Sequence, residues 1–111
     1  MKLYYAPQAK NDLMEIREYI SQYLQNPIAA KNVTSKILKT ASLLGEQPRL
    51  GFSVAEKTGR ETDTLCIFSG NYGIFYKITD AGILVLRILD ARTDYMRFVF
   101  AEGPEAEENI E

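Results

Sequence analysis

Residues 72–89 read YGIFYKIT, DAG and ILVLRIL, two runs of β-type residues on either side of a three-residue turn. Gly82 stands where a tight hairpin loop favours a left-handed backbone, so this stretch predicts an antiparallel hairpin. The second run is apolar on both faces except at Arg87, which is typical of a central strand covered on both sides. An earlier run from Leu65 to Phe68, followed by a turn at residues 69–71, predicts a third strand.

The first half of the chain has helical rather than strand periodicity. Leu3 to Tyr5 predicts a short opening strand that stops at Pro7. The apolar residues that then recur at three- and four-residue steps are Leu13, Ile16, Tyr19 or Ile20, Tyr23 and Leu24. Asn26 and Pro27 predict the start of a second helix, because Asn caps well and Pro at the first position sacrifices no hydrogen bond. That helix runs to about Gly45, so we expect an antiparallel helix pair.

These elements predict an α+β fold. Its two layers are an N-terminal strand with an antiparallel helix pair, packed on a small antiparallel β-sheet. Residues 46–63 are polar and predict a loop with a short edge strand near Gly51 to Ala55. Residues 91–100 fit a short helix or an extended segment equally well. We expect one domain over residues 1–101 and an acidic, disordered tail at 102–111.

The charge is divided unevenly along the chain. Its 111 residues hold 13 Lys and Arg against 15 Asp and Glu, a net charge of −2. Five of the acids are glutamates of residues 102–111, so residues 1–101 carry 13 bases against 10 acids, about +3. Our hypothesis is that the tail shields a cationic face, in which case deleting residues 102–111 strengthens binding to an acidic partner.

Composition excludes several classes of site. The chain has no His and a single Cys, so zinc fingers, His-based triads and disulfide frameworks are unavailable, and we expect no metal and no cofactor. Cys66 lies in an apolar strand and is predicted to be a core residue. No apolar run approaches the roughly 20 residues that span a bilayer, and the N-terminus lacks a signal-peptide pattern. We therefore expect a cytoplasmic protein without membrane contact.

The predicted hairpin also defines a candidate surface. Its register pairs Thr79 with Ile83, Lys77 with Val85 and Phe75 with Arg87. Strand alternation then places six residues on one face: Gly73, Phe75, Lys77, Val85, Arg87 and Leu89. Arg92, Tyr95 and Arg97 follow that strand, and guanidinium groups beside aromatic rings suit contact with phosphate or an acidic partner.

Each of these residues also has a purely structural interpretation. Arg87 could pair with Asp90 or Asp94 and lie along the sheet edge. Asp12 and Glu15, one turn apart on the first helix, are interpreted as a solvated helix face rather than a pair of catalytic carboxylates.

Several motifs occur in an order that belongs to a known family. They are Tyr5 to Ala9, Asp12 to Ile20, Asn26 to Ala30, Pro48 to Gly51, Asn71 to Ile78 and Leu86 to Tyr95. In this ordered set the chain resembles the RelE/ParE superfamily of toxins from bacterial type II toxin–antitoxin systems, the plasmid-stabilisation proteins. The resemblance covers residues 3–100 and implies the same α+β fold. It also implies a cognate antitoxin protein that wraps across the helices and the sheet.

The superfamily has two branches with different targets. RelE-type members cleave mRNA on the ribosome, and that resemblance would assign catalysis to Arg92, Lys77, Arg87 and Tyr95. ParE-type members inhibit DNA gyrase without chemistry of their own.

The motifs of this chain depart from both branches. Gly73 replaces an Arg of the nuclease strand motif, and Phe98 stands where RelE has a late Tyr. Asp90 and Thr93 replace a His and an Arg that are frequent in the ParE pattern. We expect the ParE-like branch, hence a gyrase inhibitor, and the question of enzymatic activity stays open. The alternatives are a ribosome-dependent mRNA endoribonuclease or an inactive, antitoxin-binding member.

Overall fold

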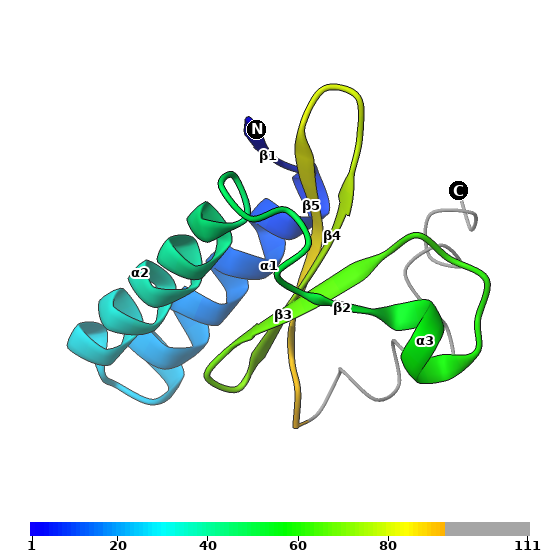
Figure 1. Ribbon diagram of the computed structural model, residues 1–111. Coiled ribbons are helices and arrows are strands. Elements are labelled where there is room, and N and C mark those ends of the chain that lie inside the picture. Colours follow the sequence, from blue (N-terminus) through cyan, green and yellow to red (C-terminus); the bar gives the residue numbers. More distant parts are fainter. Residues whose placement is uncertain (93–111) are drawn as a thin grey trace.

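The computed structural model describes residues 1–92 of the chain (Figure 1). Its elements are β1 (Leu3–Tyr5), α1 (Pro7–Glu18), the π-helical turn η1 (Tyr19–Tyr23), α2 (Pro27–Leu43), β2 (Phe52–Ser53), α3 (Val54–Thr58), β3 (Leu65–Ser69), β4 (Tyr72–Ile78) and β5 (Ile83–Asp90). The predicted α+β fold is confirmed. The predictions for residues 93–100, the domain boundary at 101 and the tail lie outside the described residues.

A five-stranded sheet in the order β1-β5-β4-β3-β2 forms one layer. Strands β2 to β5 pair antiparallel, as predicted, but β1 joins the edge parallel to β5. The sheet is therefore mixed rather than antiparallel. Parallel strands need a long crossover connection, and the helix pair and the other strands, which lie between β1 and β5 in the chain, provide it. As expected, β5 is an inner strand, between β1 and β4.

The helix pair covers one face of the sheet, and the short α3 lies on the other side (Figure 1). Ile37 and Ala41 of α2 pack with Ile74, Tyr76 and other sheet residues in the main core. A smaller cluster on the opposite face joins Val54 of α3 to Cys66, Phe75 and Leu89. Cys66 is buried, as predicted, and burial raises the pKa of its thiol to about 12, so it carries no reactive thiolate near neutral pH.

The start of α2 forms as the sequence predicts. The side chain of Asn26 accepts a hydrogen bond from the backbone N–H of Ala29 at 3.1 Å, and Pro27 occupies the first helical position. The preceding residue, Gln25, has a positive φ of 52°. A left-handed residue directly before the cap reverses the chain within a few residues, which places α2 antiparallel to α1.

The end of the first helix differs from the prediction. Tyr23 and Leu24 were expected on the buried face, but they are 76% and 52% exposed, whereas Ile20 is buried. The reason is the π-helical turn at residues 19–23, which widens the helix and rotates the following side chains away from the core. Tyr19, exposed for about half its surface, lies on the same outer side.

The β4–β5 hairpin differs from the predicted register by one residue near its turn. Thr79 closes the turn with Gly82 rather than with Ile83, since the Thr79 N–H donates to the Gly82 carbonyl at 2.7 Å. Lys77 consequently faces Leu84, and Val85 faces Tyr76 on the helix side. A β-bulge with Leu86 as the extra residue then restores the predicted pairing of Phe75 with Arg87. Val85 was therefore wrongly placed on the Phe75 face.

Helix α3 was not predicted at all. The edge strand expected near Gly51 to Ala55 exists as β2, but it ends at Ser53 and a helix begins there. The Ser53 hydroxyl caps that helix by accepting from the N–H of Glu56 at 3.2 Å, and Gly59 ends it with a φ of 75°. Ser and Glu three residues apart, followed by Gly, form a recognisable helix signal, but the helix of five residues is too short to show apolar periodicity.

Candidate functional site

The end of β5 presents an arginine held by its own strand. The guanidinium of Arg92 donates from Nη2 to Oδ2 of Asp90 at 3.0 Å and from Nε to Oδ1 at 3.2 Å. The backbone N–H of Arg92 also donates to Oδ1 at 2.7 Å. The Arg92 side chain is 63% exposed, so this two-point ion pair lies at the surface. It fixes both the course of the chain after β5 and the direction of the guanidinium.

Tyr72 lies next to this ion pair, because it pairs with Asp90 across the β4–β5 ladder. Its pKa is raised, first by burial and then by the charge of Asp90, with Arg92 opposing the effect. A phenol with a raised pKa stays protonated at neutral pH, so Tyr72 is a hydrogen-bond donor here and not a ready base.

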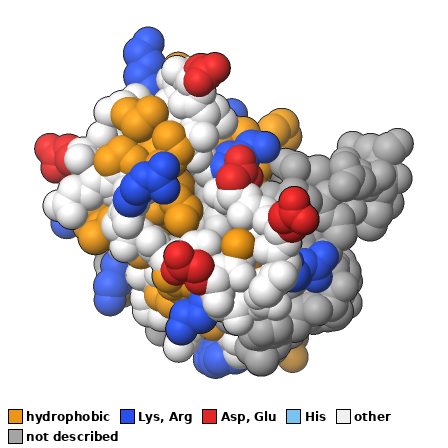
Figure 2. Space-filling view, turned by 45° about the vertical axis from the view of Figure 1, so that its right-hand side comes forward, with side chains coloured by type: hydrophobic (Ala, Val, Ile, Leu, Met, Phe, Trp, Pro, Cys, Tyr) orange, Lys and Arg blue, Asp and Glu red, His pale blue; other side chains and the backbone are white. Residues whose placement is uncertain are grey.

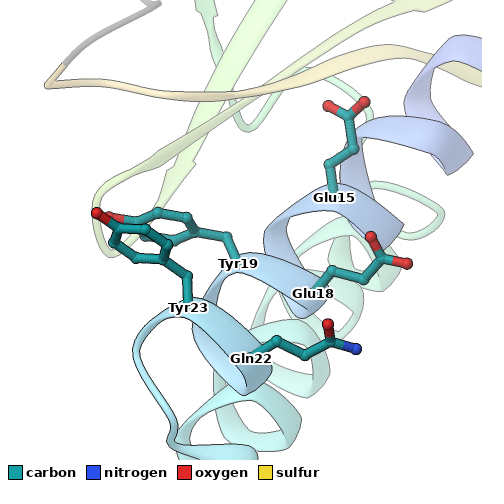
Figure 3. A pocket seen from close by; sticks show the side chains of 5 residues that line it. All are labelled: Glu15, Glu18, Tyr19, Gln22 and Tyr23. Carbon is teal, nitrogen blue, oxygen red and sulfur yellow. The ribbon is translucent and has the colours of Figure 1, made fainter.

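Tyr19 and Tyr23 extend the aromatic surface along the end of the first helix. Their rings stack with centroids 5.1 Å apart and planes 14° apart. Figure 3 shows the two rings side by side on one side of the helix, whereas the side chains of Glu18 and Gln22 point to the other side and Glu15 lies one turn earlier. These five residues line a shallow, open hollow rather than an enclosed cavity. Such a surface suits contact with another macromolecule better than enclosure of a small substrate.

A second arginine, Arg87, lies in a buried ion pair. Its Nε and Nη2 donate to the carboxylate of Asp12 at 2.8 and 3.2 Å, and the backbone N–H of Ile88 donates to the same carboxylate at 2.9 Å. The side chains of Arg87 and Asp12 are only 15% and 5% exposed. The solvated helix face predicted for Asp12 is therefore wrong. Its carboxylate joins α1 to the edge of β5 beyond the end of β1.

Of the two partners suggested for Arg87 from the sequence, Asp90 and Asp94, only Asp90 is among the described residues. Asp12, from the first helix, is its partner here, and Asp90 instead binds Arg92. Asp94, the other suggested partner, lies outside the described residues. Glu15 does belong to an exposed helix face, where it accepts a hydrogen bond from Asn11 at 3.2 Å.

The structure separates the predicted site residues along the hairpin. Lys77 lies opposite Leu84, whereas Arg92 follows Asp90 at the other end of β5. Tyr72, the partner of Asp90, is five residue steps from Lys77 along β4, and at about 3.3 Å a step the two ends of the ladder lie roughly 17 Å apart. Arg87 lies between them with its guanidinium directed to Asp12. Tyr95, Thr93 and Phe98 lie outside the described residues.

Residues 1–92 hold no cluster of three or more potential metal ligands, and none of their helices is long and apolar enough to cross a membrane. The face shown in Figure 2 carries a hydrophobic patch with acidic and basic side chains interspersed around it. That face is therefore not uniformly cationic.

Sequence reasoning missed the tyrosines of the site and the role of Asp12. The i, i+4 spacing of Tyr19 and Tyr23 was visible, but it fits a buried helix face as well as an exposed stack. The proximity of Asp90 to Arg92 was also visible, since a carboxylate two residues before an arginine at a strand end can close on it.

Comparison with known proteins gives the chain its family. No curated protein sequence matches it. A chain in the solved structure of a chromosomal ParDE toxin–antitoxin system from P. aeruginosa superposes with a TM-score of 0.67 and 18% sequence identity, covering 81% of this chain and 95% of the other. That likeness establishes the shared fold. The family model described as the ParE toxin of the type II toxin–antitoxin system parDE matches residues 3–95, and the chain therefore belongs to the ParE toxin family.

Proposed function

We propose that this toxin is neutralised by a cognate antitoxin protein and acts by binding DNA gyrase, without chemistry of its own. The observation that carries the proposal is the separation of the cations that a nuclease would need. Lys77 and Arg92 stand at opposite ends of the β4–β5 ladder, and the Arg87 guanidinium is engaged by Asp12. A nuclease must bring an acid, a base and charge stabilisation to one phosphate.

The exposed surface supports binding as the mode of action. The stacked Tyr19 and Tyr23, with the Arg92 ion pair, supply residue types that are enriched at protein–protein interfaces.

The helix pair also offers a surface for the antitoxin. Met14 of α1 and Ile28, Leu38 and Leu43 of α2 are large apolar side chains that the described residues leave exposed. Exposed apolar side chains favour a partner that covers them.

The test compares the two targets directly. Purified toxin is added to a gyrase supercoiling assay and, separately, to a ribosome-programmed mRNA cleavage assay. We expect inhibited supercoiling, intact messages and, on induction in cells, filamentation that co-expression of the antitoxin reverses. Cleavage of mRNA at ribosomal A sites would overturn the proposal in favour of the endoribonuclease. An absence of both effects would point to an inactive, antitoxin-binding member.

Two substitutions sharpen this test. Arg92→Ala removes a cation from the proposed binding surface, whereas Lys77→Ala removes one from the far end of the hairpin. A gyrase-binding toxin is expected to lose activity with the first and keep it with the second. A nuclease that uses both cations would lose activity with either.

A further inference from the structure

The exposed arginine at the end of β5, Arg92, is already paired with the carboxylate of Asp90. We propose that Asp90 lowers the affinity of this surface for its partner, because its carboxylate competes with an acidic protein segment for the Arg92 guanidinium. The proposal rests on the proposed function in taking a protein as the partner. It concerns how tightly that partner is held.

The geometry makes Asp90 an internal competitor. Its two carboxylate oxygens accept from Nη2 and Nε of Arg92 at 3.0 and 3.2 Å, the same two-point contact that an incoming carboxylate would make. A guanidinium has five N–H donors, so an external carboxylate can still approach, but at an edge already next to a negative charge. Binding at Arg92 is therefore weaker than the exposed arginine alone would give.

The surroundings favour a protein partner over a phosphate. Tyr72 lies across the ladder from Asp90, and its protonated hydroxyl can donate. Tyr19 and Tyr23 add exposed aromatic area, while Glu15 and Glu18, which line the same shallow hollow, repel a densely anionic polymer such as RNA. An acidic protein segment can place one carboxylate at the arginine, and because its charges are less dense than those of RNA, the nearby glutamates repel it less.

Asp90 also has a structural role that the test must keep separate. Its Oδ1 accepts from the backbone N–H of Arg92 at 2.7 Å, so it shapes the turn that follows β5. Asp90→Asn removes the charge and retains an oxygen acceptor for that N–H. Asp90→Ala removes both, and therefore reports on the turn.

The experiment measures anion binding to the full-length protein. Poly-L-glutamate and tripolyphosphate are titrated separately, and binding to every variant is measured by isothermal titration calorimetry; where Arg92 is present, its Nε–H resonance is also followed by NMR. The variants are Asp90→Asn, Asp90→Ala, Arg92→Ala, the combination of Asp90→Asn with Arg92→Ala and, as the matched control, Asp80→Asn. Asp80 is exposed in the turn at the far end of the same hairpin, so its substitution changes the net charge equally.

We expect Asp90→Asn to bind poly-L-glutamate roughly three- to tenfold more tightly than the wild type, from the loss of one exposed ion pair and one nearby like charge. Asp80→Asn is expected to change binding less than twofold, and Asp90→Asn is expected to give no tightening when it is combined with Arg92→Ala. Equal affinities for the wild type and Asp90→Asn, or equal gains in Asp90→Asn and Asp80→Asn, would overturn the proposal. Tightening that Asp90→Ala shows and Asp90→Asn does not would assign the effect to the turn, and would equally overturn it. Tightening for tripolyphosphate alone would overturn the choice of a protein partner.

Gyrase inhibition by the same variants keeps the two proposals distinguishable. If none of the proteins inhibits supercoiling while Asp90→Asn still binds poly-L-glutamate more tightly, the proposed function fails and the competition by Asp90 stands. If the wild type inhibits supercoiling and Asp90→Asn binds poly-L-glutamate no better, the competition fails and the proposed function stands.

Discussion

At the scale of single residues, Asp12 connects α1 to β5, although its sequence position suggests a polar, solvent-facing side of the helix. Its carboxylate takes two donors from Arg87 and one from the backbone of Ile88, and it is only 5% exposed. Strand β1 ends at Tyr5, so within residues 1–92 no strand lies beside the edge of β5 beyond Val85. Asp12 supplies there the acceptor that a longer β1 would have provided.

The burial of Asp12 could not be predicted from the sequence. Helical periodicity assigns a residue to a face of its own helix, but it does not say where a strand 75 positions later in the chain will pass. Arg87 shows the same limit, because only its neighbours in sequence, Asp90 and Asp94, could be weighed as partners.

Asp12→Ala is expected to lower the free energy of unfolding by about 3–5 kcal/mol, since it removes a buried carboxylate that accepts from the Arg87 guanidinium and from the backbone N–H of Ile88. Urea denaturation monitored by circular dichroism measures this change. The matched control is Glu15→Ala, which removes an exposed carboxylate from the same helix and should cost no more than about 0.5 kcal/mol. Similar losses in the two variants would show that the Asp12–Arg87 pair contributes little to stability.

At the scale of elements, the sequence predicted most strands and both long helices because each carries a strong local signal. Asn26 and Pro27 begin α2 as expected, and the two runs around residues 80–82 form the hairpin. The failures are local irregularities. The π-helical turn at Tyr19–Tyr23 and the bulge at Leu86 each shift side chains to another face without changing the composition of their element.

These irregularities matter for the candidate site. The π-helical turn lies where the stacked tyrosines become exposed, and the bulge lies directly before Arg87. With a regular helix and an unbulged strand, other side chains would be exposed at these two places. The exposure of the two tyrosines and the face of the sheet that Val85 occupies were therefore the least predictable features.

Gly82 is the residue on which the junction of β1 and β5 depends. It has a φ of 146°, and a Cβ there would collide with the backbone carbonyl of Lys2. Gly82→Ala is therefore expected to cost about 3 kcal/mol or more, and to reduce hydrogen-exchange protection of the Ile83 N–H, which donates to Lys2 at 2.8 Å.

Gly59→Ala is the control for backbone strain alone. Gly59 has a φ of 75° with open space around it, so the substitution should cost only about 1–2 kcal/mol. Thermal unfolding and hydrogen exchange compare the two variants. An equal loss of stability, with Ile83 still protected in Gly82→Ala, would mean that the contact with β1 is not limiting.

At the scale of the whole molecule, the division of charge predicts how the toxin responds to acidic partners. The full chain has a net charge of −2, but the five glutamates of residues 102–111 account for more than that excess. Without them the remaining residues carry about +3, and Arg92 is among the cations exposed on the described surface. The tail glutamates can weaken attraction to a polyanion in two ways. They can lie near those cations and screen them, or they can act only by making the net charge of the whole chain negative.

Replacing the five tail glutamates by Gln in the full-length protein separates these two cases. We expect the variant to elute from a heparin column at higher salt than the wild type, because an anionic segment competing for the cationic surface has been neutralised. The matched control replaces five exposed glutamates of the described residues by Gln, namely Glu15, Glu18, Glu46, Glu56 and Glu61. It changes the net charge equally, so a shift that is larger for the tail variant assigns the effect to the tail. Equal shifts would leave only net charge as the cause, and an unchanged elution of the tail variant would reject shielding altogether.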